Sequence, residues 1–244
     1  MLARDRARFA AALRFALAAH GGQKRKGTEI PYASHFVQVA GLVLEHGGDA
    51  DQAIAGLLHD SLEDCPGVTE AELRRRFGRE VARLVRGTTD LLAGDTPKRR
   101  SPWLRRKRAF LARLRRQDAR VRLVSGCDKL ANLRSLLADL HAEGAPTLAR
   151  FGSTPAQIRW YYESVRAALG RGLPKRLARD LDVLVAELAL FVPRADAAAA
   201  RGSCGGGTLP SEPGAETPLI RARPGAARAR RRSARRGARA PSAR

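Results

Sequence analysis

The chain has 244 residues and a formal net charge of +22 at pH 7, so it is long enough for one buried core and suits an anionic partner. Its three cysteines fit neither a disulfide framework nor a paired zinc spacing. No apolar run approaches the ~20 residues that cross a bilayer, and the first residues lack the apolar core of a signal peptide. The composition therefore predicts a cytoplasmic protein without membrane contact.

Apolar side chains recur at helical spacing over residues 9–188, and no alternating strand pattern of useful length interrupts them. Glycine and proline mark the connections between these segments at 21–22, 47–48, 66–67, 94–97, 144–146 and 170–174. We predict an all-α, bundle-like domain of about eight to ten helices. It is expected to occupy residues 1–194.

His35 is the first candidate metal ligand along the chain. Pro31 marks the start of a helix, and apolar residues continue at helical spacing at Val39, Ala40 and Val43. His35 is therefore expected in the first turn of that helix. Taken alone, such a histidine is more often a hydrogen-bonded residue at a helix start than a ligand.

The next candidates lie in segment 59–64, where His59 and Asp60 end an apolar helical run and Glu63 and Asp64 follow. An imidazole beside a carboxylate suits a divalent metal with mixed nitrogen and oxygen ligation, such as manganese, iron or zinc. The spacing predicts that a continuous helix gathers all four groups towards one end of one face. Acids crowded in this way repel one another unless a cation lies among them. The alternative is a solvated helix end.

Asp128 ends the apolar run 121–127, so its carboxylate is expected to face the interior, where it needs a partner. Asn132 follows one turn later on the same face and can hydrogen-bond a substrate. Asp128 alone could equally be a helix cap or the ion-pair partner of Lys129. The coincidence of these signals along the chain favours a metal-dependent hydrolase.

The order of His35, His59, Asp60 and Asp128 resembles the HD phosphohydrolase superfamily. The flanking residues narrow the resemblance to the hydrolase domain of the RelA/SpoT alarmone enzymes and to the single-domain small alarmone hydrolases. The matching stretches are 23–28, 31–35, 57–64, 77–81, 85–90, 128–133 and, more weakly, 160–163. The resemblance implies an HD-domain helical bundle with a metal site in its core.

The resemblance also implies the chemistry of the site. It implies one Mn²⁺ held by four side chains, His35, His59, Asp60 and Asp128, and it makes Glu63 and Asp64 the groups that activate or position the attacking water. A metal lowers the pKa of bound water and draws charge from a phosphoryl oxygen, while a carboxylate accepts the proton. In the family the reaction removes pyrophosphate from the 3′ position of ppGpp or pppGpp, giving GDP or GTP. The chain is too short for an added synthetase domain, so it is expected only to degrade.

Four residues are expected to bind this substrate: Arg25, Lys26, Asn132 and Tyr161. Arginine can form paired hydrogen bonds with phosphate or stack on a base, and lysine supplies a mobile charge. The alternative for Arg25 and Lys26 is a solvated basic loop. Tyr161 resembles the aromatic residue that the family places near the nucleotide sugar, and the alternative is an ordinary core tyrosine.

Two departures from the family leave the substrate open. Gln157 stands where the family often has a basic residue, one turn before Tyr161. The segment 94–103 is more basic and richer in proline than usual, and Lys98, Arg99 or Arg100 could contact phosphate. The alternative substrates are adenosine-based alarmones, NADPH through its 2′-phosphate, or a dNTP, which an HD phosphatase would hydrolyse.

Residues 195–244 form a Gly/Pro/Arg-rich tail, and residues 201–244 carry eleven arginines against two glutamates. So little apolar surface cannot offset the entropy of ordering, which predicts disorder. The tail could contact RNA or DNA non-specifically through phosphate neutralisation, or could only keep the protein soluble. A nucleic-acid-binding or antitoxin-like protein with a purely structural HD site is the alternative from a different class.

Overall fold

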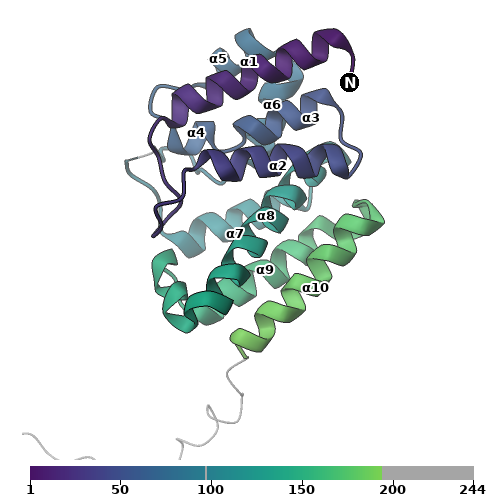
Figure 1. The fold of residues 1–244 in the computed structure, drawn as a ribbon. Coiled ribbons are helices and arrows are strands. Elements are labelled where there is room, and N and C mark those ends of the chain that lie inside the picture. The colour runs from purple at the N-terminus through teal and green to yellow at the C-terminus, as the bar shows by residue number, and fades with distance from the viewer. Residues whose placement is uncertain (97, 194–244) are drawn as a thin grey trace, which may run out of the picture. The chain divides into compact units, whose positions relative to one another are not determined.

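The computed structural model describes residues 1–96 and 98–193, so the predicted domain boundary at 194/195 and the tail lie outside the described residues. Within these residues the chain folds into helices, and β-structure is limited to two isolated bridges, which confirms the all-α prediction. Figure 1 shows the helices in chain order: α1 (Ala3–His20), α2 (Ala33–Glu45), α3 (Ala50–Leu58), α4 (Ser61–Asp64), α5 (Glu70–Phe77), α6 (Arg79–Thr88), α7 (Trp103–Leu114), α8 (Ala119–Glu143), α9 (Pro155–Leu169) and α10 (Lys175–Phe191). Two 3₁₀ segments complete them, η1 (Ala145–Phe151) and η2 (Gly170–Gly172). None of the described helices is both long and apolar enough to span a membrane.

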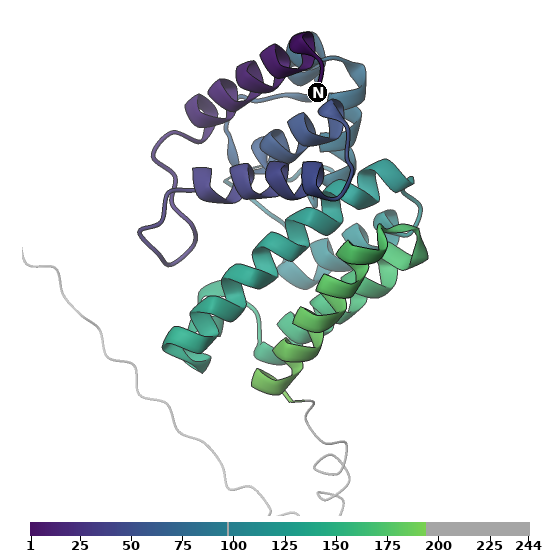
Figure 2. The same ribbon diagram turned by 45° about the vertical axis from the view of Figure 1, so that its right-hand side comes forward.

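Among the described residues, α8 is the longest helix, with 25 residues, and it organises the core. It packs against α2, α3 and α6 on one side and against α9 and α10 on the other, as Figure 1 and Figure 2 show. Apolar side chains are buried along its whole length, from Val121 to Leu140, because neighbours surround it. Asp128, in the middle of α8, is therefore held in the interior.

A close crossing of α2 and α3 brings two predicted ligands together. A Cβ on Gly56 would lie 3.1 Å from the Cα of Ala40, so only glycine allows the two backbones to approach this closely. His35 lies in the first turn of α2, as predicted, and His59 directly follows the end of α3. The two imidazole rings are 5.0 Å apart between centroids.

The predicted continuous helix through segment 59–64 is wrong. Helix α3 ends at Leu58, and α4 is a separate single turn that begins after Asp60. The ring Nδ1 of His59 donates to the carbonyl oxygen of Gly56 (2.8 Å), which is the acceptor that the Asp60 amide would need in a continuing α-helix. Because of this break, His59 and Glu63 do not lie on one continuous helix.

The departure at Gln157 has a structural explanation. Thr154 and Gln157 form a capping box at the start of α9, in which each side chain accepts a hydrogen bond from the other's backbone amide. Gln157 therefore starts the helix that carries Tyr161.

Candidate active site

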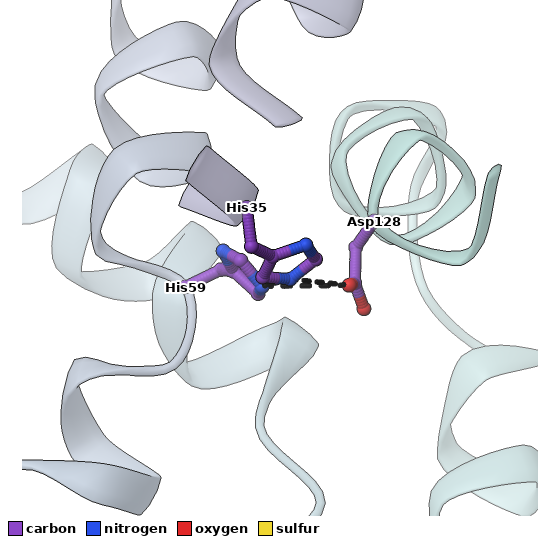
Figure 3. Close-up of side chains that lie close together, drawn as sticks. All are labelled: His35, His59 and Asp128. Atoms are coloured by element: carbon purple, nitrogen blue, oxygen red, sulfur yellow. Dashed lines mark hydrogen bonds and ion pairs between the residues drawn. The ribbon is translucent and has the colours of Figure 1, made fainter. Parts of the chain in front are cut away.

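Three buried side chains from three helical segments meet in the core. His35, His59 and Asp128 point toward one another in Figure 3, and each offers a ligand atom within 4.8 Å of the other two. The two Nε2 atoms are 3.2 Å apart. Asp128 Oδ1 lies 3.3 Å from Nε2 of His35 and 3.4 Å from Nε2 of His59.

These distances fit a divalent cation. Ligand atoms about 2.1 Å from one cation stand roughly 3.0–3.4 Å apart in octahedral or tetrahedral coordination. The ring orientation fits as well, because His59 uses Nδ1–H to donate to a carbonyl oxygen and so presents the lone pair of Nε2 in its neutral form. The centre can therefore hold a metal that accepts nitrogen and oxygen ligands.

Asp60, the fourth predicted ligand, lies beside this group. Its Oδ2 is 2.8 Å from His59 Nε2 and 3.6 Å from His35 Nε2. The same oxygen accepts a hydrogen bond from the hydroxyl of Tyr32. No sequence pattern indicated this contact of Tyr32, although the residue lies only three positions before His35.

The electrostatics of the centre favour positive charge. Burial opposes ionisation of His59, yet Asp60 and Asp128 hold its pKa well above the usual range. Burial likewise opposes ionisation of Asp128, but Lys129 and His59 hold the pKa of that carboxyl well below its usual range. Burial also opposes ionisation of Asp60, but His59 holds the pKa of that carboxyl well below its usual range, so two ionised carboxylates attract a cation to the centre.

Asp128 is also bonded to its own helix. Lys129 Nζ donates to Asp128 Oδ2 (2.5 Å), and Asn132 Nδ2 donates to Asp128 Oδ1 (2.6 Å). Arg25 in turn donates to the side-chain oxygen of Asn132 (3.2 Å). Asn132 thus links Arg25 to the candidate metal centre.

The two candidate water-handling acids share Arg100, whose Nη1 lies 3.7 Å from Glu63 Oε2, and each has a further partner of its own. Glu63 Oε1 accepts from the backbone amide of Asp90 (2.7 Å), while Asp64 accepts from Arg100 (2.5 Å) and from Gln23 (3.2 Å). Burial, followed by the charges of Asp90 and Asp60, raises the pKa of Glu63 to about 8. The prediction that both acids share one helical face with His59 and Asp60 is wrong, because α4 is separate from α3.

Arg100 belongs to the basic segment 94–103, in which the sequence did not show which residue contacts phosphate. Its Nη2 also donates to the backbone carbonyl of Glu63 (2.6 Å), so it holds the turn that carries both acids. Lys98 and Arg99 are exposed. Of the three candidate phosphate contacts, Arg100 is the one placed beside the acids.

A second cluster of charged residues contacts Glu63 through Asp90. Asp90 pairs with Arg106 (2.5 Å) and with Lys107 (2.5 Å), and Lys107 Nζ also lies 5.0 Å from the ring centroid of Tyr161. This cluster could not be predicted from the sequence, because the run of basic residues at the start of α7 has the pattern of a solvated helix face.

A cavity of about 210 Å³ adjoins the candidate metal centre. All four predicted substrate-binding residues line it, Arg25, Lys26, Asn132 and Tyr161. Lys107 and Lys129 add two further cations, and Trp103 adds an aromatic surface. The cavity can therefore take a ligand with both a ring system and negative charge.

Residues 12–153 match the HD-domain family, and this range includes every candidate metal ligand. The chain belongs to the HD-domain family. Curated HD-domain relatives include the probable guanosine-3′,5′-bis(diphosphate) 3′-pyrophosphohydrolase of Synechocystis sp., 39% identical over 125 residues that make up 50% of this chain and 16% of that protein. The guanosine-3′,5′-bis(diphosphate) 3′-pyrophosphohydrolase of Aquifex aeolicus is also 39% identical over 125 residues, 51% of this chain and 17% of that protein. The chain thus spans about a sixth of the length of these relatives.

A solved structure is similar over nearly its whole length. It is described as a metazoan ortholog of SpoT that hydrolyses ppGpp and plays a role in starvation responses. The similarity has a TM-score of 0.61 at 28% identity and covers 75% of this chain and 97% of that one. The HD domain of this chain is therefore similar to that protein in both its helical arrangement and its sequence.

Proposed function

We propose that this HD-domain protein is a divalent-metal-dependent phosphohydrolase that removes the 3′-pyrophosphate of ppGpp or pppGpp, giving GDP or GTP and pyrophosphate. One observation carries the proposal: ligand atoms of His35, His59 and Asp128 lie within 4.8 Å of one another beside a cationic cavity. The relatives support the choice of substrate, since two curated relatives and one solved relative are described with this nucleotide.

The proposed ligands are His35, His59, Asp60 and Asp128, and the proposed ion is Mn²⁺, which accepts a mixed set of imidazole and carboxylate ligands. A bound divalent cation supplies Lewis acidity to a phosphoryl oxygen and makes water more acidic. Tyr32 orients Asp60 through its hydroxyl, and Gly56 orients His59 through its carbonyl.

Glu63 is the proposed general base. Its raised pKa, about 8, makes it a stronger base than an exposed glutamate, and the Asp90 amide fixes one of its oxygens. Asp64, held by Arg100, is proposed to position the attacking water. Arg25, Lys26, Lys107 and Lys129 offset the phosphate charges of the substrate, and Tyr161 lies against its sugar.

The direct test is an assay of the purified full chain with ppGpp and Mn²⁺. The proposal expects GDP and pyrophosphate in equal amounts, and it expects Asp60→Asn to lose both metal and turnover because a neutral amide is a poorer ligand. Full metal occupancy without these products contradicts the proposal. Parallel reactions with NADPH and a dNTP show whether the same centre serves another phosphorylated nucleotide.

The proposed location is the cytoplasm. Cys65 and Cys127 are buried free thiols, which suits its reducing conditions.

The arginine-rich segment 201–244, outside the described residues, is proposed to contact RNA or DNA. Salt-dependent RNA binding that persists after deletion of residues 200–244 contradicts this role.

A further inference from the structure

One face of α8 runs from the candidate metal centre along the cavity. Asp128, Asn132, Ser135 and Asp139 follow at intervals of four, three and four residues, which places them on one helical face. The last three line the cavity. With a rise of about 1.5 Å per residue, Asp139 stands roughly 16 Å along the helix from Asp128. The cavity therefore has a metal end and a far end, and a carboxylate stands at each.

The size and the walls of the cavity suit a bicyclic base. An apolar cavity of roughly 150 Å³ accepts benzene, and this one measures about 210 Å³. Trp103, Phe151 and Tyr161 supply aromatic surfaces on which a planar ring can stack. Ser153 and Tyr161 also line the cavity, and the buried hydroxyl of each has no hydrogen-bond partner among residues 1–96 and 98–193.

Asp139 presents an acceptor at the far end of the cavity. Its Oδ2 accepts from Arg150 (3.3 Å), and no side chain in the described part of the chain bonds its Oδ1. An ionised carboxylate accepts hydrogen bonds and donates none. Guanine carries two neighbouring donors on one edge, N1–H and N2–H₂, whereas adenine offers one donor and one acceptor there. The carboxylate matches guanine and repels the ring nitrogen of adenine.

Arg150 fixes Asp139 in this position. It packs across Gly27, where a Cβ would lie 2.6 Å from Arg150 Cδ, and it also pairs with Glu143 one turn beyond Asp139. Gly27 has a positive φ of 74° and closes the loop that carries Arg25 and Lys26. Arg150 thus ties the far end of the cavity to the loop that faces the substrate, and it offsets part of the charge of Asp139.

We infer that Asp139 determines base specificity by accepting hydrogen bonds from the N1–H and N2–H₂ groups of a guanine bound in the cavity. The inference rests on the proposed function for the identity of the reacting group, and it adds the residue that selects the base. The phosphates lie toward Asp128 and the guanine edge toward Asp139.

The test compares three substrates on the full chain: the 3′,5′-bis(diphosphates) of guanosine, inosine and adenosine. Inosine differs from guanosine only by the missing N2 amino group. Because a hydrogen bond to a charged group is strong, the wild type should prefer guanosine over inosine and over adenosine by about 10- to 100-fold in kcat/KM. Equal rates on guanosine and inosine overturn the inference, and this result does not depend on any variant.

Two variants separate recognition from packing. Asp139→Asn replaces one acceptor by a donor and should reduce the guanosine-to-inosine preference to about 2-fold or less. Glu143→Gln is the matched control, since it removes the charge of the other partner of Arg150 without facing the cavity, and it should keep the wild-type preference. A preference that survives in Asp139→Asn, or that is lost equally in both variants, overturns the inference.

Calorimetric binding of GDP, IDP and ADP distinguishes this inference from the proposed function. The same order of affinity, lost in Asp139→Asn, supports the role of Asp139 even if no substrate is hydrolysed, in which case the proposed function alone fails. Equal affinity for the three nucleotides overturns the inference, whatever the hydrolysis assay shows.

Discussion

Replacing Gly56 by alanine tests how the fold brings the two histidines together. A Cβ at this position would lie 3.1 Å from Cα and 3.3 Å from the backbone nitrogen of Ala40, and backbone atoms cannot rotate away. Gly56→Ala therefore forces α2 and α3 apart by a few tenths of an ångström. That displacement disturbs the 3.2 Å separation of the Nε2 atoms of His35 and His59.

Two effects of opposite sign set the stability of this variant. Alanine in a helix interior is more favourable than glycine by about 1 kcal/mol, whereas overpacking a filled core costs about 1–3 kcal/mol. Gly41 is exposed in the interior of α2, and apart from its chain neighbours and the nearby backbone of α2 no atom among the described residues lies within 4 Å of its missing Cβ, so Gly41→Ala isolates the first effect. Gly41→Ala should raise the free energy of unfolding by about 1 kcal/mol. Gly56→Ala should leave it unchanged or lower it by up to about 2 kcal/mol.

Urea denaturation of both variants measures the stability difference, and calorimetric titration with Mn²⁺ measures the metal affinity. We expect Gly56→Ala to bind Mn²⁺ more weakly than the wild type and Gly41→Ala to bind it equally well. If both variants gain the same stability and keep the wild-type affinity, the close crossing of α2 and α3 does not position the histidines.

Three further substitutions test the contacts around the centre. Glu63→Gln should keep Mn²⁺ bound and slow ppGpp hydrolysis ~10²–10⁴-fold; a normal single-turnover rate at matched occupancy removes its role as general base. Tyr32→Phe should weaken Mn²⁺ binding about 10-fold or more at unchanged stability, because it removes only the hydroxyl that donates to Asp60; an unchanged calorimetric affinity contradicts this. Asp90→Asn should lower the free energy of unfolding by about 3 kcal/mol, because Lys107 then stays buried without its carboxylate. Although burial opposes it, Lys107 holds the pKa of Asp90 below its ordinary 3.8, so this stabilisation is complete above pH 3.8 and is lost as the pH falls below it. Urea denaturation at a series of pH values should show a smaller loss in Asp90→Asn than in the wild type, because Asp128 titrates in both.

Local pattern was enough to predict the elements that carry the candidate ligands. Pro31 marks the start of α2, so the position of His35 in its first turn follows from short-range rules. The apolar run before Asp128 likewise predicts a buried carboxylate, and Asp128 is 5% exposed. These features depend on neighbours within one or two helical turns.

The features that could not be predicted depend on contacts between distant segments. Arg100 reaches Asp64 across 36 residues, and no periodicity in its segment indicates this. The break after Leu58 depends on the side chain of His59 competing for a backbone acceptor, which a helical pattern of apolar residues does not record. Asp139 lies among ordinary amphipathic residues of α8, and only the packing of η1 and α9 around it makes its face part of a cavity.

The most direct test of the central claim is the Mn²⁺ stoichiometry of histidine variants, measured by elemental analysis after equilibrium dialysis. His59→Gln removes a proposed ligand, and His141→Gln removes an exposed histidine that pairs with Glu187. With folding verified by circular dichroism, we expect one tightly bound Mn²⁺ per chain in the wild type and in His141→Gln, and none in His59→Gln. Full occupancy in His59→Gln contradicts the metal centre formed by His35, His59 and Asp128.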